Sequence, residues 1–142
     1  MVHWSKDETD EITSTWKSID RYLLGAKALA RMFKVYPWTT RYFQKLTEFT
    51  ASSHGVREHA KKVMDALDCA VLHLDDVKSH FTDLSKKHAD ELHVDVHSFR
   101  LLAKCFVIEL AIVRKEKFPP QIQAIWEKYF AVVVDAISRQ YH

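Results

Sequence analysis

Apolar residues recur at helical spacing along the first part of the chain, with short breaks between the repeats. A capping-box pattern that begins at Ser5 predicts a helix reaching about Ile19. Apolar positions predict a second helix over residues 21–35, which Pro37 ends because proline disfavours helical geometry in the residue before it. The aromatic stretch YPWTTRYF then predicts a short helical turn. Residues 44–55 are polar with weak periodicity, which predicts a connecting loop.

The same periodicity continues to the C-terminus. It predicts one helix over residues 56–74 and a second from the Asp75-Asp76 interruption to about Leu92. A third helix is predicted from a cap at Asp95 or Ser98 to about Lys115. The last predicted helix runs from the break at residues 117–120 to about Arg139. No repeat, low-complexity tract or linker divides the chain. The pattern therefore predicts an all-α single domain over residues 1–142, with six or seven helices.

Composition agrees with a helical domain and narrows the function classes. Only 2 Gly and 3 Pro punctuate the 142 residues, and the net charge of +2 comes from interleaved acidic and basic residues. Without a basic stripe we expect no nucleic-acid partner, and without a long apolar run we expect no membrane partner. The polar N-terminus lacks a signal-peptide core, so we expect a cytoplasmic protein. Cys69 and Cys105 are far apart and fit no metal or redox spacing; a disulfide between them is the less favoured alternative.

Two histidines fall where apolar side chains are expected. With Val63 and Leu67 near the centre of the apolar stripe of their helix, His59 lies about 40° from Val63 on its flank. His88 lies between Leu84 and Leu92 in direction on the following helix, so both imidazoles can face one interior space. Each could simply hydrogen-bond a backbone carbonyl in the core, since a buried imidazole needs polar partners. Zinc would need further ligands at suitable spacing, so a flat apolar iron cofactor suits the pair better.

Other chemistry finds little support in the sequence. The chain has no GxSxG, no HExxH and no glycine loop for phosphates, and its carboxylates fit solvated helix faces, so we do not expect an enzyme. Gly25 lies inside a predicted helix, where glycine costs about 1 kcal/mol relative to alanine. We therefore expect Gly25 to permit a close helix crossing.

The stretches VYPWTTRYF, REHAKKV, LSKKHADELHVD and RQYH, in this order along the whole chain, resemble vertebrate haemoglobins. The resemblance implies a globin fold around a haem pocket and reversible oxygen transport with haem b. It implies that His88 is the proximal iron ligand and His59 the distal histidine beside bound oxygen, with Val63 crowding the ligand. The remaining haem-pocket positions that it implies are Phe43, Lys62, Leu67, Leu84, Leu92, Val94, Phe99, Leu102 and Ile137.

The tryptophan of YPWT and the terminal Tyr141-His142 resemble β-type chains rather than α-type chains. Between Phe43 and His59 the sequence is several residues shorter than common β chains, so we expect the small fourth helix to be missing. Ala60 stands where glycine commonly follows the distal histidine, which could tighten or shift the helix crossing near Gly25.

A β-type chain implies an α-type partner, an α2β2 tetramer and the cytoplasm of the red blood cell. The interface residues that the resemblance implies are Trp38, Arg41, His93 and Asp95 for the sliding contact, and Arg31, Val113, Phe118, Pro120 and Gln123 for the static one. Haemoglobin is the standard example of a quaternary switch through rotation of αβ dimers.

Two regulatory sites are also implied by the resemblance. His142 would pair with Asp90 in the deoxy state, and because a carboxylate raises a histidine pKa, protons would favour oxygen release. Val2, His3, Lys78 and Arg139 would bind an organic phosphate between β chains, although scattered surface charge is the alternative. Two rival hypotheses stay open: a helical interaction module with purely structural histidines, and a monomeric oxygen-storage or sensing globin.

Overall fold

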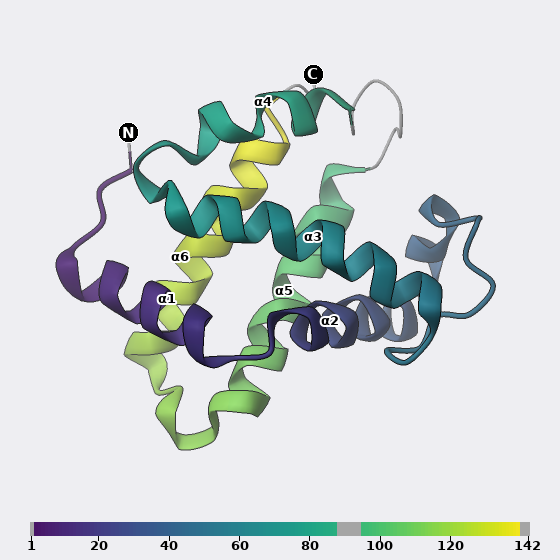
Figure 1. Cartoon of the computed structure of the whole chain (residues 1–142), viewed down its shortest axis with the longest axis horizontal. Coiled ribbons are helices and arrows are strands. Elements are labelled where there is room, and N and C mark those ends of the chain that lie inside the picture. Colours follow the sequence, from purple (N-terminus) through teal and green to yellow (C-terminus); the bar gives the residue numbers. More distant parts are fainter. Residues whose placement is uncertain (1, 88–94, 140–142) are drawn as a thin grey trace.

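The predicted all-α class is confirmed by the computed structural model, which describes residues 2–87 and 95–139 (Figure 1). The α-helices are α1 (Lys6–Ser18), α2 (Arg21–Val35), α3 (His54–Leu72), α4 (Val77–Lys87), α5 (Val96–Arg114) and α6 (Pro120–Ile137). Short 3-10 helices connect them: η1 (Pro37–Tyr42), η2 (Leu74–Asp76) and η4 (Lys115–Lys117). The predicted extension of α4 to Leu92 lies outside the described residues.

Local hydrogen bonds explain where three of the helices begin. At α1 the predicted capping box is formed: the Ser5 hydroxyl accepts from the Glu8 N–H at 3.1 Å, and the Glu8 carboxylate accepts from the Ser5 N–H at 2.9 Å. At α2 the Asp20 carboxylate is the cap, because it accepts from the Leu23 N–H at 3.1 Å. Asp95 caps α5 through the N–H of His97 at 3.0 Å, which decides between the two caps that the sequence left open.

The core lies where α2 packs on α3 and α5, and where α6 packs on α1, α4 and α5 (Figure 1). Trp126 and Tyr129 of α6 are fully buried at its centre. The Trp16 ring of α1 stacks on Trp126, with centroids 5.9 Å apart. Large aromatic side chains thus fill the inner side of α6, and this apolar burial is the main source of stability.

The close crossing expected at Gly25 is confirmed. A Cβ placed on Gly25 of α2 would lie 2.7 Å from Met64 Cγ and 3.4 Å from Ala60 Cβ, both on α3. The predicted centre of the α3 stripe is wrong in one respect: Met64 is fully buried, whereas Val63 is half-buried. Because Gly25 has no side chain, α2 leaves room for Met64, and the side of α3 that carries Met64 therefore packs against α2.

Residues 43–53 form turns and bends without a helix, so the expectation that the small fourth helix is missing is confirmed. Ser53 organises the end of this loop, because its hydroxyl donates to the carbonyls of Glu48 and Thr50 at 3.2 and 2.8 Å. Helix α3 begins directly after it, two residues earlier than predicted. Both cysteines are free, so the disulfide alternative is wrong. Among the described residues, no helix combines the length and apolar character needed to cross a bilayer.

Candidate functional site

His59 lies half-buried on α3, in edge-to-face contact with Phe43, the first residue after η1. The two ring centroids are 4.8 Å apart and the ring planes meet at 84°. Phe43 in turn meets the ring of Phe33 on α2, with centroids 5.0 Å apart at 73°. Edge-to-face contacts orient aromatic rings, so α2, η1 and α3 together position the imidazole of His59.

Two residues of the loop before α3 support this arrangement, and one of them, Phe49, was not predicted as part of the site. The Phe49 ring packs edge-on against Phe33, with centroids 5.1 Å apart. Leu46 lies so close to Gly55 that a Cβ on that glycine would overlap its side chain. An aromatic and a leucine within an otherwise polar loop were the available signal, but the weak periodicity directed attention away from them.

The other predicted pocket residues differ in exposure. Leu67 is buried on α3, while Lys62 is exposed on the same helix. The half-buried members are Val63 on α3, Leu84 on α4, Phe99 and Leu102 on α5, and Ile137 at the end of α6. His88, Leu92 and Val94 lie outside the described residues. The structure therefore supplies half-buried apolar side chains from four helices.

Hydrogen bonds from buried groups fix two of these positions. The Tyr129 hydroxyl donates to the carbonyl oxygen of Leu67 at 2.9 Å, and burial raises the pKa of Tyr129 well above 10. The tyrosine thus stays a neutral donor. The Ser85 hydroxyl of α4 donates to the carbonyl oxygen of Ile137, which ties α4 to the end of α6.

These residues fit a haem. Val63, Leu84, Leu102 and Ile137 pack against the core but remain partly exposed, as expected of apolar side chains whose covering group is a flat apolar ring. His59 adds an imidazole on α3, one turn before Val63 of this apolar wall. A pocket that is mostly apolar, with few polar groups, is typical of cofactor sites.

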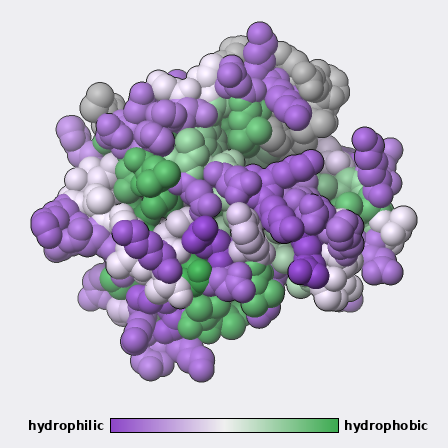
Figure 2. All heavy atoms as spheres, viewed as in Figure 1, coloured by the Kyte–Doolittle hydropathy of each residue, from purple (hydrophilic) through white to green (hydrophobic). Residues whose placement is uncertain are grey.

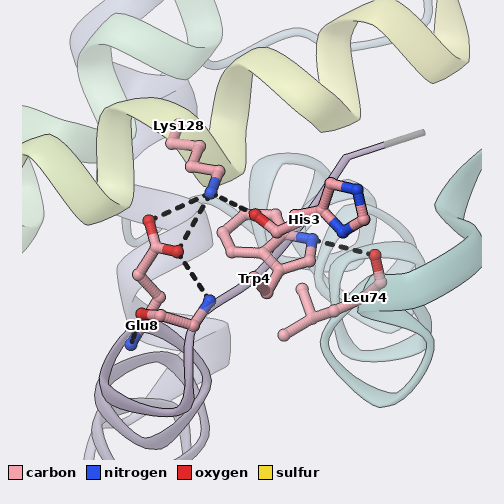
Figure 3. A network of polar contacts seen from close by, with 6 residues as sticks. His3, Trp4, Glu8, Leu74 and Lys128 are labelled. Atoms are coloured by element: carbon pink, nitrogen blue, oxygen red, sulfur yellow. Dashed lines mark hydrogen bonds and ion pairs between the residues drawn. The ribbon is translucent and has the colours of Figure 1, made fainter.

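The N-terminal segment is held on the surface by the side chain of Lys128 from α6 (Figure 3). Its Nζ donates to both carboxylate oxygens of Glu8 at 3.0 Å and to the carbonyl of His3 at 2.6 Å, and lies 4.4 Å from the centroid of the Trp4 ring. The Trp4 indole donates to the carbonyl of Leu74 at 3.0 Å. This network brings the N-terminal segment to η2, directly before α4.

Consequently, the predicted phosphate-binding residues Val2 and His3 are exposed near the start of α4, which carries the exposed Lys78. The fourth residue, Arg139, is exposed and pairs with Asp135 at 3.6 Å.

Most predicted interface residues are exposed. The face of the molecule that Figure 2 shows is largely hydrophilic, with separate hydrophobic areas. Trp38 is 50% exposed and Val113 48%, large values for such apolar side chains. The other exposed residues of the predicted interface are Arg41, Asp95, Pro120 and Gln123. Phe118 is half-buried. Arg31 is half-buried, because its guanidinium pairs with the buried Glu109 of α5 at 2.6 Å. His93, Asp90 and His142 lie outside the described residues.

Comparison with known proteins identifies the family. The globin family model matches residues 26–137, so the chain belongs to the globin family. It is 75% identical over 141 residues to the haemoglobin subunit beta of Heterodontus portusjacksoni (99% of this chain, 100% of the relative), and 57% identical over 142 residues to that of Mustelus griseus (100% of both chains). The resemblance to β-type haemoglobin chains is thereby confirmed.

Solved structures agree. The deoxy haemoglobin of Mustelus griseus matches with a TM-score of 0.91 and 56% identity, covering 99% of this chain and 100% of that chain. The deoxy haemoglobin of Dasyatis akajei matches with a TM-score of 0.95 and 44% identity over the same shares. The predicted globin fold is therefore confirmed.

Proposed function

We propose that the chain binds and transports oxygen reversibly, with haem b as its cofactor, as the β-type subunit of an α2β2 haemoglobin in the cytoplasm of red blood cells. The observation that carries this proposal is the position of His59, half-buried, held against Phe43 and one turn before Val63 on α3. Full-length similarity to β subunits of haemoglobin supports it.

Haem iron, when bound, supplies the reversible oxygen-binding centre. His88 would hold the iron, and His59 would provide an imidazole N–H as a hydrogen-bond donor on the distal side. Val63, one turn along α3 from His59, would add steric bulk there, and the exposed Lys62 would meet a haem propionate. The apolar wall would exclude water, which protects the iron from oxidation.

An α-type partner would cover the exposed apolar residues. Trp38 and Val113 are each about half exposed, and Val35 and Ile112, both 53% exposed, lie on the same helices as the predicted static contact. Partner subunits characteristically cover such side chains. The Arg31–Glu109 pair would hold one part of this surface rigid before assembly.

Proton and phosphate regulation follow from the same proposal. Pairing of His142 with Asp90 would raise the histidine pKa in the deoxy state and couple proton uptake to oxygen release. Val2, His3, Lys78 and Arg139 of two β-type chains would offer a polyanion several cationic groups. The network around Lys128 supports this site, because it holds the N-terminal segment close to α4.

Visible absorption spectra with and without oxygen test the proposal. We expect an oxygen-dependent haem spectrum, co-purification with an α-type chain, and loss of stable haem retention in His88→Gly. His54→Gly, at the exposed start of α3, is the matched control and should keep the spectrum. A colourless wild-type protein would support the interaction-module alternative. A coloured protein that stays monomeric beside an α-type chain would support the storage or sensing globin.

A further inference from the structure

Three potential metal ligands meet at the junction of α3 and α4, away from the haem pocket. Cys69 lies on the last turns of α3, His73 is the C-cap of that helix, and His80 lies on the first turns of α4. One ligand atom from each lies within 4.8 Å of the other two, and Cys69 Sγ is 3.8 Å from His73 Nδ1. The fold thus brings together residues that the spacing of the two cysteines alone did not point to.

These distances suit a transition metal. Zinc binds sulfur at about 2.3 Å and imidazole nitrogen at about 2.0–2.1 Å, so tetrahedral geometry places the two ligand atoms roughly 3.5 Å apart. The distance of 3.8 Å from Sγ to Nδ1 is already close to that value. The rings of His73 and His80 are stacked with centroids 3.8 Å apart, and His80 is exposed. Its ring can therefore rotate to complete the set.

The surroundings also favour a cation. His73 Nδ1 also lies 3.0 Å from the carbonyl oxygen of Cys69, and this nitrogen exchanges that contact for the metal when it binds as part of a neutral imidazole. Asp75 and Asp76 lie between the two histidines in the sequence and carry exposed acidic side chains. The site borders solvent through His80, so water can occupy a fourth coordination position.

We propose that Cys69, His73 and His80 bind one Zn²⁺ ion per chain. On binding, the Cys69 thiol loses its proton to solvent, a sulfur–zinc bond forms, and no electron is transferred. Zinc thereby connects the end of α3 with the start of α4 across η2. Two imidazoles, a thiolate and a water molecule form a borderline-soft ligand set that suits Zn²⁺ better than Mg²⁺ or Ca²⁺.

The test is a zinc titration of the haem-loaded, carbon-monoxide-bound protein assembled with its partner chains, in competition with a fluorescent zinc chelator. We expect His80→Gln and Cys69→Ser each to weaken one site per chain at least tenfold. His97→Gln, an exposed histidine on α5, is the matched control and should bind zinc like the wild type. An unchanged haem spectrum establishes that each variant is folded.

Zinc affinity and stoichiometry that do not differ between the wild type and both ligand variants would overturn the proposal. Alkylation by iodoacetamide, measured by peptide mass spectrometry, gives a second readout because the thiolate is both the nucleophile and the ligand. Zinc at a concentration that just saturates the wild-type site should slow alkylation of Cys69 in the wild type and in His97→Gln, and much less in His80→Gln. Equal zinc protection in the wild type and in His80→Gln would likewise contradict the site.

Discussion

Replacing Gly25 with alanine tests how closely α2 and α3 approach each other. The added Cβ would lie 2.7 Å from Met64 Cγ and 2.8 Å from Met64 Sδ, at least about 0.7 Å short of ordinary van der Waals separation. Met64 is fully buried, so its side chain has no free space to move into. Either Met64 or the whole of α3 must shift.

Two opposing terms determine the magnitude. Alanine favours the helix over glycine by about 1 kcal/mol, whereas overpacking a closed core costs about 1–3 kcal/mol. The contacts involve the middle of the Met64 side chain rather than its flexible end, which places the cost in the upper part of that range. We therefore expect Gly25→Ala to lower the free energy of unfolding by about 1–2 kcal/mol.

A double-mutant cycle separates the two terms. Met64→Ala alone should cost about 2–5 kcal/mol, because it leaves a cavity between α2 and α3. In that background the clash is gone and the helix preference remains, so adding Gly25→Ala should stabilise the protein by up to ~1 kcal/mol. The sign of the Gly25→Ala effect thus reverses between the two backgrounds.

Urea unfolding of the carbon-monoxide-bound protein, followed by far-UV circular dichroism at one protein concentration, measures the free energies of unfolding of the wild type and the three variants. Ala30→Gly, also on α2 but only half-buried and five residues from Gly25, calibrates the helix preference. A stabilising Gly25→Ala in the wild-type background would refute the close crossing. A coupling energy within about 0.5 kcal/mol of zero would do the same.

Three further predictions concern single groups. Hydrogen bonds from the Ser5 backbone and from Lys128 lower the pKa of Glu8 below 4.5, so the stabilisation is present above pH 4.5 and is lost as pH falls through the folded-state pKa. Glu8→Gln should therefore lower the free energy of unfolding by roughly 0.5 kcal/mol at neutral pH and have no effect in acid. A destabilisation that persists in acid would contradict the pairing. Burial raises the pKa of the Cys105 thiol to about 11, so iodoacetamide at pH 8 should not label it in the native protein, and labelling at the denatured rate would contradict its burial. Asp90→Asn should shrink the proton effect on oxygen affinity while Asp83→Asn leaves it intact, and an undiminished effect would exclude the expected pair.

Helix positions could be predicted from the sequence because their signals are local. The capping box at Ser5 and the hydrophobic periodicity over residues 21–35 depend only on neighbours along the chain, and both elements form where they were expected. The centre of the α3 stripe depends on a partner helix instead. Met64 rather than Val63 is fully buried, because Gly25 lies opposite it, and periodicity alone carries no information about that partner.

The residues of the candidate site also differ in whether a local sequence signal or a contact made by the fold reveals them. His59 stands out because a histidine on the flank of an apolar stripe breaks the binary pattern, and the structure places it half-buried. Phe49 was not predicted, since its packing against Phe33 depends on how the loop folds. The group of Cys69, His73 and His80 was missed because its third member lies on another helix, beyond the range of a local spacing rule.

The shortened loop explains why these packing contacts matter for the position of His59. Without the small fourth helix, residues 43–53 must hold the start of α3 by side-chain packing. Leu46 against Gly55 and Phe43 against His59 provide two such contacts, and Phe49 against Phe33 ties the same loop to α2. The Gly25–Met64 crossing fixes the middle of the same helix. The imidazole of His59 therefore lies between two anchor points on α3, so the helix keeps His59 in place although the segment before it is short.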